Sequence, residues 1–220
     1  MKFQSKHFTV SCITALSVSL FFVLQYVKVF SILGNCAAFF RCSDMITPLF
    51  GNAGLPSFGL LIAVRFGFRM LFYGTPLSAL VYHLPGFCAS AYWAFDNKIV
   101  SLLIPLICMV AFLMHPTGFA AAPYVLYWFI PITLYFVRSK TVFMHSLSST
   151  FIAHAVGSVV WVYLHPMSPK FWLALIPLVA FERLVFASGM AFVYHVTVFV
   201  KKNFLQEVYF KRNSKVTLHD

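Results

Sequence analysis

Residues 99–137 read IVSLLIPLICMVAFLMHPTGFAAAPYVLYWFIPITLYFV and contain no Asp, Glu, Lys or Arg. A second stretch, residues 141–169, is also free of these four residue types. A membrane-spanning helix needs about 20 consecutive apolar residues. Lipid offers no partners for backbone N–H and C=O groups, which favours helices. A transmembrane barrel would alternate apolar and polar residues, whereas these stretches are mostly apolar all round. Both stretches therefore predict transmembrane helices.

The composition of the whole chain points the same way. Of its 220 residues, 61% are hydrophobic and 10% are charged, whereas a soluble domain carries about 25% charged residues. The formal charge is +11, and the basic residues gather at the ends of apolar segments. This placement favours cytoplasmic loops beside anionic lipid headgroups over a nucleic-acid partner. We therefore expect a lipid bilayer, and no nucleic acid, around this protein.

The fold class expected is all-α: a polytopic transmembrane helical bundle of about six helices. The count lies between six and eight because segment 29–40 is too short to span. Segment 45–64 holds five Gly and Pro residues, which favour a broken helix. Residues 1–200 would form one domain, and residues 201–220 a basic cytoplasmic tail. The apolar segments, in chain order, are 8–27 (an uncleaved first helix), 29–40, 45–64, 70–95, 99–114, 119–137, 141–164 and 171–200.

Orientation follows from the basic loops. If the tail is cytoplasmic, the charged loops at residues 96–98 and 138–140 are cytoplasmic too, in agreement with the positive-inside rule. Arg65 and Arg69 would then lie outside, which violates the rule. The crossings between residues 28 and 69 therefore stay open.

Segment 141–164 carries a polar stripe. At about 100° per residue, its polar and aromatic side chains fall within a narrow arc: Thr150, His154, Ser158, Trp161 and His165. In lipid such a stripe would be unsatisfied, so we expect it to face the bundle or a cavity. One interpretation is a binding pocket with His154, Ser158 and Trp161 in its wall. The other is packing between helices through small and polar residues.

Glu182 and Arg183 interrupt the last apolar segment. A charge at the centre of a spanning helix costs about 2.5–3.5 kcal/mol. Adjacent residues on a helix point about 100° apart, so we expect the two to be poor partners for each other. Either Glu182 faces the bundle, where it binds a cationic solute or organises the core, or the pair marks the end of an interfacial segment.

Charged residues also flank the Gly/Pro-rich segment: Arg41, Asp44, Arg65 and Arg69. Broken helices near the membrane midplane often bind solutes through free helix ends. With the basic residues nearby, this region predicts a site for an anionic or zwitterionic solute, to which Arg41 and Asp44 would contribute. Loop charges at the membrane surface are the alternative.

His115 and His165 each precede a proline at an expected turn, and together with His154 they suggest a metal or haem site as an alternative. No HExxH, Walker A or GxSxG motif is present, so the sequence lacks the parts of a zinc protease, ATPase or hydrolase of those kinds. The five cysteines include no CxxC pair. We therefore expect no cofactor, and an enzyme is the second hypothesis rather than the first.

The sequence RCSDMITPL at residues 41–49, with Gly51, Gly54 and Gly59 after it, resembles the substrate-capture subunits of energy-coupling factor vitamin transporters. The resemblance covers a limited part of the chain. It implies a small basic six-helix membrane protein that binds a vitamin-like solute. It also implies docking of a coupling subunit through small residues four apart in the first helix, here Ala15 and Ser19. The histidine turns and the Glu182–Arg183 pair have no counterpart in that family.

The leading hypothesis is a small-solute binding and uptake protein of the bacterial inner membrane. Its solute would lie between the polar stripe around His154 and the segment from Arg41 to Arg69. Because no energy-coupling motif is present, uptake would need partner subunits or an ion gradient. The alternatives are a membrane enzyme or haem/metal protein using His115, His154 and His165, and an accessory protein without a ligand.

Overall fold

The structure is a computed structural model, and it describes residues 28–29, 40–41, 45–74, 76–95, 99–137 and 141–216. The expected helix 8–27 and most of segment 29–40 lie outside this part. The described residues are almost entirely helical, which confirms the all-α prediction. The exception is a short antiparallel pair of strands, β1 (Lys28–Val29) with β2 (Phe40–Arg41).

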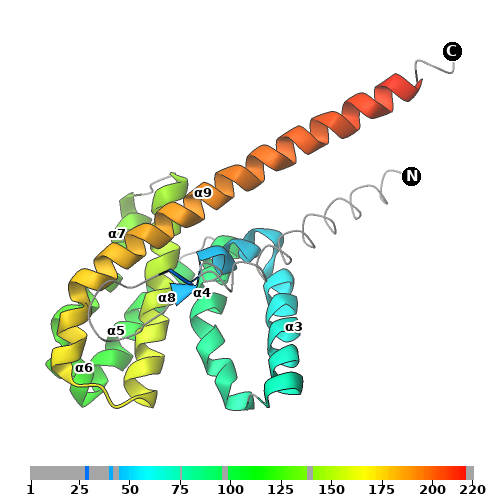
Figure 1. Cartoon of the computed structure of the whole chain (residues 1–220). Helices are drawn as coiled ribbons and strands as arrows, with labels where there is room; N and C mark the ends of the chain where they lie inside the picture. Colours follow the sequence, from blue (N-terminus) through cyan, green and yellow to red (C-terminus); the bar gives the residue numbers. More distant parts are fainter. Residues whose placement is uncertain are drawn as a thin grey trace.

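Helix α8 (Val142–Leu164) lies at the centre, where four other helices contact it (Figure 1). The label η marks a 3₁₀-helix or, for η3, a π-helix. The helical elements in chain order are η1 (Thr47–Ala53), α3 (Leu55–Tyr73), η2 (Leu77–His83), α4 (Leu84–Phe95), η3 (Ile99–Leu103), α5 (Ile104–Met114), α6 (Pro116–Ala120), η4 (Ala122–Trp128), α7 (Phe129–Val137), α8 and α9 (Pro169–Val216). The four that contact α8 are α4, α5, α7 and α9.

The Gly/Pro-rich segment is broken, as predicted. Gly54, with φ of 94°, separates η1 from α3, a backbone conformation that glycine adopts without strain. Residues 70–95, expected as one apolar segment with Pro76 and Pro85 inside it, divide among three elements. Helix α3 continues past Arg69 and ends at Gly74, which has φ of 60°. A left-handed glycine followed shortly by a proline is a common helix stop, and Pro76 supplies that proline. Two further elements, η2 and α4, follow it.

Two helices are long and apolar enough to cross a membrane, judged by length and composition among the described residues. These are α8 and the first part of α9, Pro169–Val200. Shorter apolar helices cover Ile99–Met114 and Ala122–Val137. Helix α9 runs on to Val216 without interruption, so most of the expected tail continues the helix. In Figure 1 this end of α9 extends well beyond the other helices.

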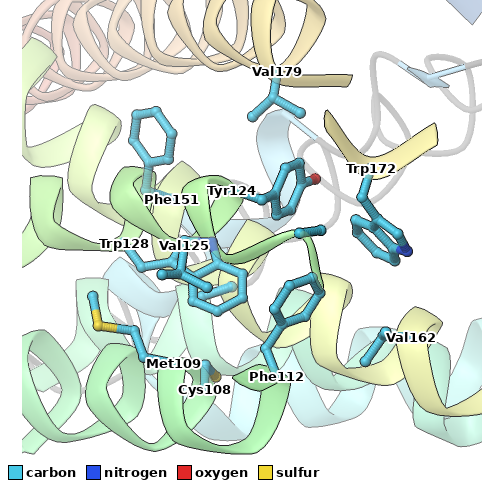
Figure 2. Close-up of a cluster of buried hydrophobic side chains, with 12 residues drawn as sticks. Cys108, Met109, Phe112, Tyr124, Val125, Trp128, Phe151, Val162, Trp172 and Val179 are labelled. Carbon is cyan, nitrogen blue, oxygen red and sulfur yellow. The ribbon is translucent and has the colours of Figure 1, made fainter. Parts of the chain in front are cut away.

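An aromatic cluster joins α5, η4 and the start of α9 (Figure 2). The ring centroids of Phe112 and Trp172 lie 5.1 Å apart, and those of Phe112 and Trp128 lie 5.3 Å apart, both edge to face. Tyr124 meets Trp172 in the same manner at 5.0 Å. Edge-to-face pairs contribute about 0.5–1.5 kcal/mol beyond area burial. The cluster therefore holds Tyr124, Trp128 and Trp172 in fixed positions beside α8.

Candidate functional site

A cavity of about 510 Å³ lies between α8 and α9. The polar stripe of α8 forms one wall, and α9 contributes the Glu182–Arg183 pair to the other. Tyr82 and His83 of η2 and Thr47 of η1 complete the lining on the side of the broken segment. Because α8 and α9 are joined by a short turn at residues 165–168, they form an antiparallel pair whose facing sides border this space.

His154 is the centre of a hydrogen-bond network in the cavity wall. The indole Nε1 of Trp128 donates to His154 Nδ1 at 3.2 Å. The other ring nitrogen, Nε2, lies 2.8 Å from the hydroxyl of Tyr124 and 3.5 Å from that of Ser158. An indole N–H can only donate, so Nδ1 is the acceptor and Nε2 carries the proton. His154 is therefore neutral and donates to Tyr124.

The donor chain continues beyond His154. Tyr124 accepts from Nε2–H, so its own O–H hydrogen is free to donate. Ser158 is within hydrogen-bonding reach of Tyr124. Whichever of the two hydroxyls comes last, its hydrogen points away from His154. The network therefore presents a hydroxyl donor at its end, and both hydroxyl residues line the cavity.

Glu182 and Arg183 form an ion pair, which corrects the expectation that they would be poor partners. Arg183 Nη2 lies 2.8 Å from Glu182 Oε1, and each side chain is 9% exposed. The Cα–Cβ directions of adjacent helix residues diverge by about 100°, but the long arginine side chain spans this separation. Arg183 also donates through Nη1 to the Thr150 carbonyl at 3.4 Å and packs over Phe186 at 4.7 Å.

The burial of this pair favours the interpretation in which Glu182 faces the bundle. Both residues are buried, and Arg183 bonds to the Thr150 carbonyl of α8. The attraction between two paired charges offsets part of the desolvation cost of burying them. The pair thus places two opposite charges inside the helix bundle, next to the cavity.

Aromatic rings form much of the remaining wall. Trp161, Phe171 and Trp172 all line the cavity. Tyr82 lies 6.2 Å from Trp161, measured between ring centroids, and it binds His165 Nε2 through its hydroxyl at 3.1 Å. Helix α8 and η2 are thereby held together at the end of the cavity nearest to the α8–α9 turn.

Not every polar residue of α8 faces the cavity. Ser149 donates to the carbonyl of Ala89 on α4 at 3.3 Å. On the other side of α4, Ser90 donates to the carbonyl of Thr47 at 3.1 Å. Small residues let helices approach closely, and their hydroxyls bond across the interface. Packing between helices thus accounts for Ser149, whereas His154 and Ser158 line a space.

Four of the six predicted site residues line the cavity: His154, Ser158, Trp161 and Glu182. Their role in binding stays a prediction. Arg41 belongs to β2, where the structure describes only the backbone, and Asp44 lies outside the described residues. On α3, Arg69 is exposed. The broken segment reaches the cavity through Thr47, Pro48 and Ile62 instead.

Several lining residues were absent from the sequence-based prediction. Tyr124 lines the cavity and Trp128 binds His154 from behind it; the two are four residues apart in an apolar stretch, and this spacing could have indicated one helical face. The contribution of Tyr82 and His83 could not be foreseen, because it depends on the break at Gly74. Trp172 lies in the last apolar segment, residues 171–200, where the sequence-based prediction named only the charged residues Glu182 and Arg183.

The three histidines do not meet. His154 lies in the cavity described above, whereas His115 and His165 line a second one beside the α8–α9 turn. His115 accepts from the backbone N–H of Thr117 at 3.2 Å and so caps α6. Within the described residues, no group of three His, Cys, Asp or Glu could hold a metal ion. The alternative of one metal or haem site built on all three is therefore not supported.

No family model matches the chain, and no curated protein or solved structure is similar to it. The resemblance to substrate-capture subunits therefore stays an expectation.

Proposed function

We propose that this chain is an integral membrane protein of the bacterial inner membrane that binds a small solute between α8 and α9 and takes part in its uptake. The observation that carries the proposal is the cavity of about 510 Å³, with His154 in one wall and the buried Glu182–Arg183 pair in the other. Ligand sites are typically of about 300–1,000 Å³, mostly apolar, with a few convergent polar groups.

The outer surface supports the membrane assignment. Large apolar side chains are exposed along the part of α9 that could span, among them Phe181, Phe192 and Phe199. Leu71 on α3 is 83% exposed. In water, such contiguous apolar surface would promote aggregation, whereas lipid accommodates it. A bundle of about six crossings with a cytoplasmic C-terminus is part of this proposal.

The burial of polar groups supports a binding role. A folded chain gains little from burying an ion pair, since apolar replacements are often equally stable. Intramembrane ionisable residues commonly mark solute or ion pathways. Here the Glu182–Arg183 pair and the His154 network converge on one space, which packing alone does not require.

Uptake would depend on other components. The sequence has no Walker A motif, the phosphate-binding loop of P-loop ATPases. Coupling subunits or an ion gradient would supply the energy. We place the contact with a coupling subunit at the first helix, around Ala15 and Ser19, which lie outside the described residues.

The test compares two substitutions of the same kind. Ala153 lines the cavity, whereas Ala174 is exposed on α9. Full-length wild type, Ala153→Phe and Ala174→Phe would be purified in lipid nanodiscs, and their bound small molecules identified by mass spectrometry. We expect at least one compound to be present with wild type and Ala174→Phe and absent with Ala153→Phe. Identical contents for all three proteins would refute a solute site here.

Compounds found in this way would then be supplied to cells in labelled form. We expect cells that make the wild type to accumulate the compound faster than cells that make Ala153→Phe at equal membrane abundance. Binding without any difference in accumulation would remove uptake from the proposal and leave binding.

A further inference from the structure

Two buried hydrogen-bond donors in the cavity wall are unsatisfied. Trp172 Nε1 and Arg183 Nε are both buried and have no hydrogen-bond partner among the described residues. Trp172 is 2% exposed and Arg183 8% exposed, and both line the cavity. In Figure 2 the indole nitrogen of Trp172 points away from Phe112 and Tyr124. A buried donor without a partner costs about 1–3 kcal/mol, and a ligand that accepts a hydrogen bond from it would remove this cost.

A third donor comes from the His154 network. Its proton order runs from Trp128 through His154 to Tyr124, and it ends in a hydroxyl hydrogen on Tyr124 or Ser158. Neither an indole nor a guanidinium can act as an acceptor. The ligand must therefore supply the acceptors, in the form of carbonyl oxygens or unprotonated ring nitrogens.

The net charge of the cavity lining also limits the charge of the ligand. Glu182 and Arg183 are the carboxylate and the guanidinium in the described lining, and they compensate each other at 2.8 Å. The short distance between Glu182 Oε1 and Arg183 Nη2 compensates the charge of the carboxylate. His154 is neutral because its Nδ1 accepts from Trp128. An ionised ligand would bring an uncompensated charge into this space, which is costly.

The walls favour a flat ring. Trp161, Phe171 and Trp172 present ring faces or edges around the cavity. Aromatic side chains bind planar rings by offset stacking or edge-to-face contact. A flexible aliphatic solute would gain less from these contacts and would lose more conformational freedom on binding.

Resting on the proposed function, we infer that the solute is an uncharged, planar ring compound that carries carbonyl or ring-nitrogen acceptors. Its ring lies against Trp161 and Trp172. Its acceptors take hydrogen bonds from Trp172 Nε1, Arg183 Nε and the terminal hydroxyl of the His154 network. The Glu182–Arg183 pair stays closed and serves as a neutral donor surface rather than as a site for a charged group.

Two probes of equal size test this class. In 2-naphthamide the ring carries a neutral carbonyl group, and in 2-naphthoate it carries a charged carboxylate. Binding to the full-length wild type in lipid nanodiscs would be measured by calorimetry. Empty nanodiscs would be measured alongside, because ring compounds partition into lipid. We expect 2-naphthamide to bind at least about tenfold more tightly than 2-naphthoate, the ratio that corresponds to one hydrogen bond or a modest desolvation cost.

A pair of matched variants tests the proposed contact. Trp172→Phe removes the indole donor but keeps an aromatic ring. Trp93→Phe makes the same change at an indole whose Nε1 is also buried and without a partner, but which does not line the cavity. We expect 2-naphthamide to bind about tenfold more weakly to Trp172→Phe and unchanged to Trp93→Phe. Should Trp172→Phe fail to fold, the comparison of the two probes on the wild type still decides.

Three results would overturn the inference. They are equal or tighter binding of 2-naphthoate, unchanged affinity in folded Trp172→Phe, and no binding of either probe. The small-molecule comparison of wild type with Ala153→Phe separates this inference from the proposed function. If Ala153→Phe lacks a compound that the wild type carries while neither probe binds as expected, the solute site is supported and the inferred class of solute is wrong. If Ala153→Phe carries the same compounds as the wild type and neither probe binds, both the solute site and the inferred class of solute are refuted.

Discussion

Trp128 donates its indole N–H to Nδ1 of His154 across 3.2 Å, from η4 to the middle of α8. This bond fixes the tautomer, with the proton on Nε2. In ¹⁵N spectra of histidine-labelled protein in nanodiscs at neutral pH, we expect a nonprotonated Nδ1 and a protonated Nε2 for His154. Assignment by comparison with His154→Gln makes the resonances specific.

Trp128→Phe provides the control for this assignment, because it removes the donor and leaves Nδ1 without its bond. The Nδ1 resonance of His154 should then move downfield, toward the position of an unbonded ring nitrogen. A protonated Nδ1 in the wild type would show that the proton order through Tyr124 is reversed.

The ion pair between Glu182 and Arg183 yields a prediction about stability. Glu182→Gln leaves a buried guanidinium without its partner, and Arg183→Met leaves a buried carboxylate. Each single change should lower the free energy of unfolding by about 3–5 kcal/mol. The double variant should recover most of this loss, since no charge remains buried. Denaturant titrations of the protein in detergent, followed by circular dichroism, measure all three, and additive losses would contradict a closed pair.

Gly118 on α6 packs against the carbonyl group of Phe112. A Cβ atom there would overlap the Phe112 backbone, whereas one at Gly67 on α3 would meet nothing within 4 Å. Gly118→Ala should therefore destabilise the fold by about 1–3 kcal/mol. Gly67→Ala should leave stability unchanged or raise it by up to about 1 kcal/mol, because alanine favours the helix. Thermal unfolding of both variants compares them directly, and equal melting temperatures would argue against the tight contact.

Trp161 and Trp128 differ in the fraction of each residue that is exposed at the surface. Trp161 is 47% exposed near the end of α8, and Trp128 is 0% exposed. In bilayers of lipids brominated near the headgroup end of their chains, contact quenches indole emission. We expect the quenched fraction of the fluorescence to fall in Trp161→Phe and not in Trp128→Phe. The same quenching before and after Trp161→Phe would show that this end of α8 does not face lipid.

The parts of the fold that sequence predicts well are those set by local chemistry. Helix α8 begins after Thr141, whose side chain accepts from the Met144 N–H at 3.3 Å, and it ends at His165 before a proline. Within it, His154 and Ser158 reach the same cavity because residues four apart share a helix face. The helix is interrupted at Gly54, where the neighbouring prolines and glycines predicted an interruption.

The parts that could not be predicted depend on side-chain conformation or on contacts between distant segments. The pairing of Glu182 with Arg183 follows from rotamers, which spacing along the helix does not determine. Tyr82 reaches the cavity because the chain reverses after Gly74 and returns α4 to α8. Trp172 took part in no sequence pattern, since its role arises from packing against Phe112 and Tyr124.

Helix α9 has one more property, which follows from its length. At 1.5 Å per residue, its 48 residues extend about 72 Å, more than twice the thickness of the hydrocarbon layer of a bilayer, which is about 30 Å. The segment from Glu182 to Val216 contains no proline and one Gly/Ser pair, Ser188–Gly189, and the helix continues through that pair. The distal end of α9 therefore belongs to the same helix as the residues that line the cavity, so a partner that binds this end from the aqueous phase would contact the element that forms one wall of the site.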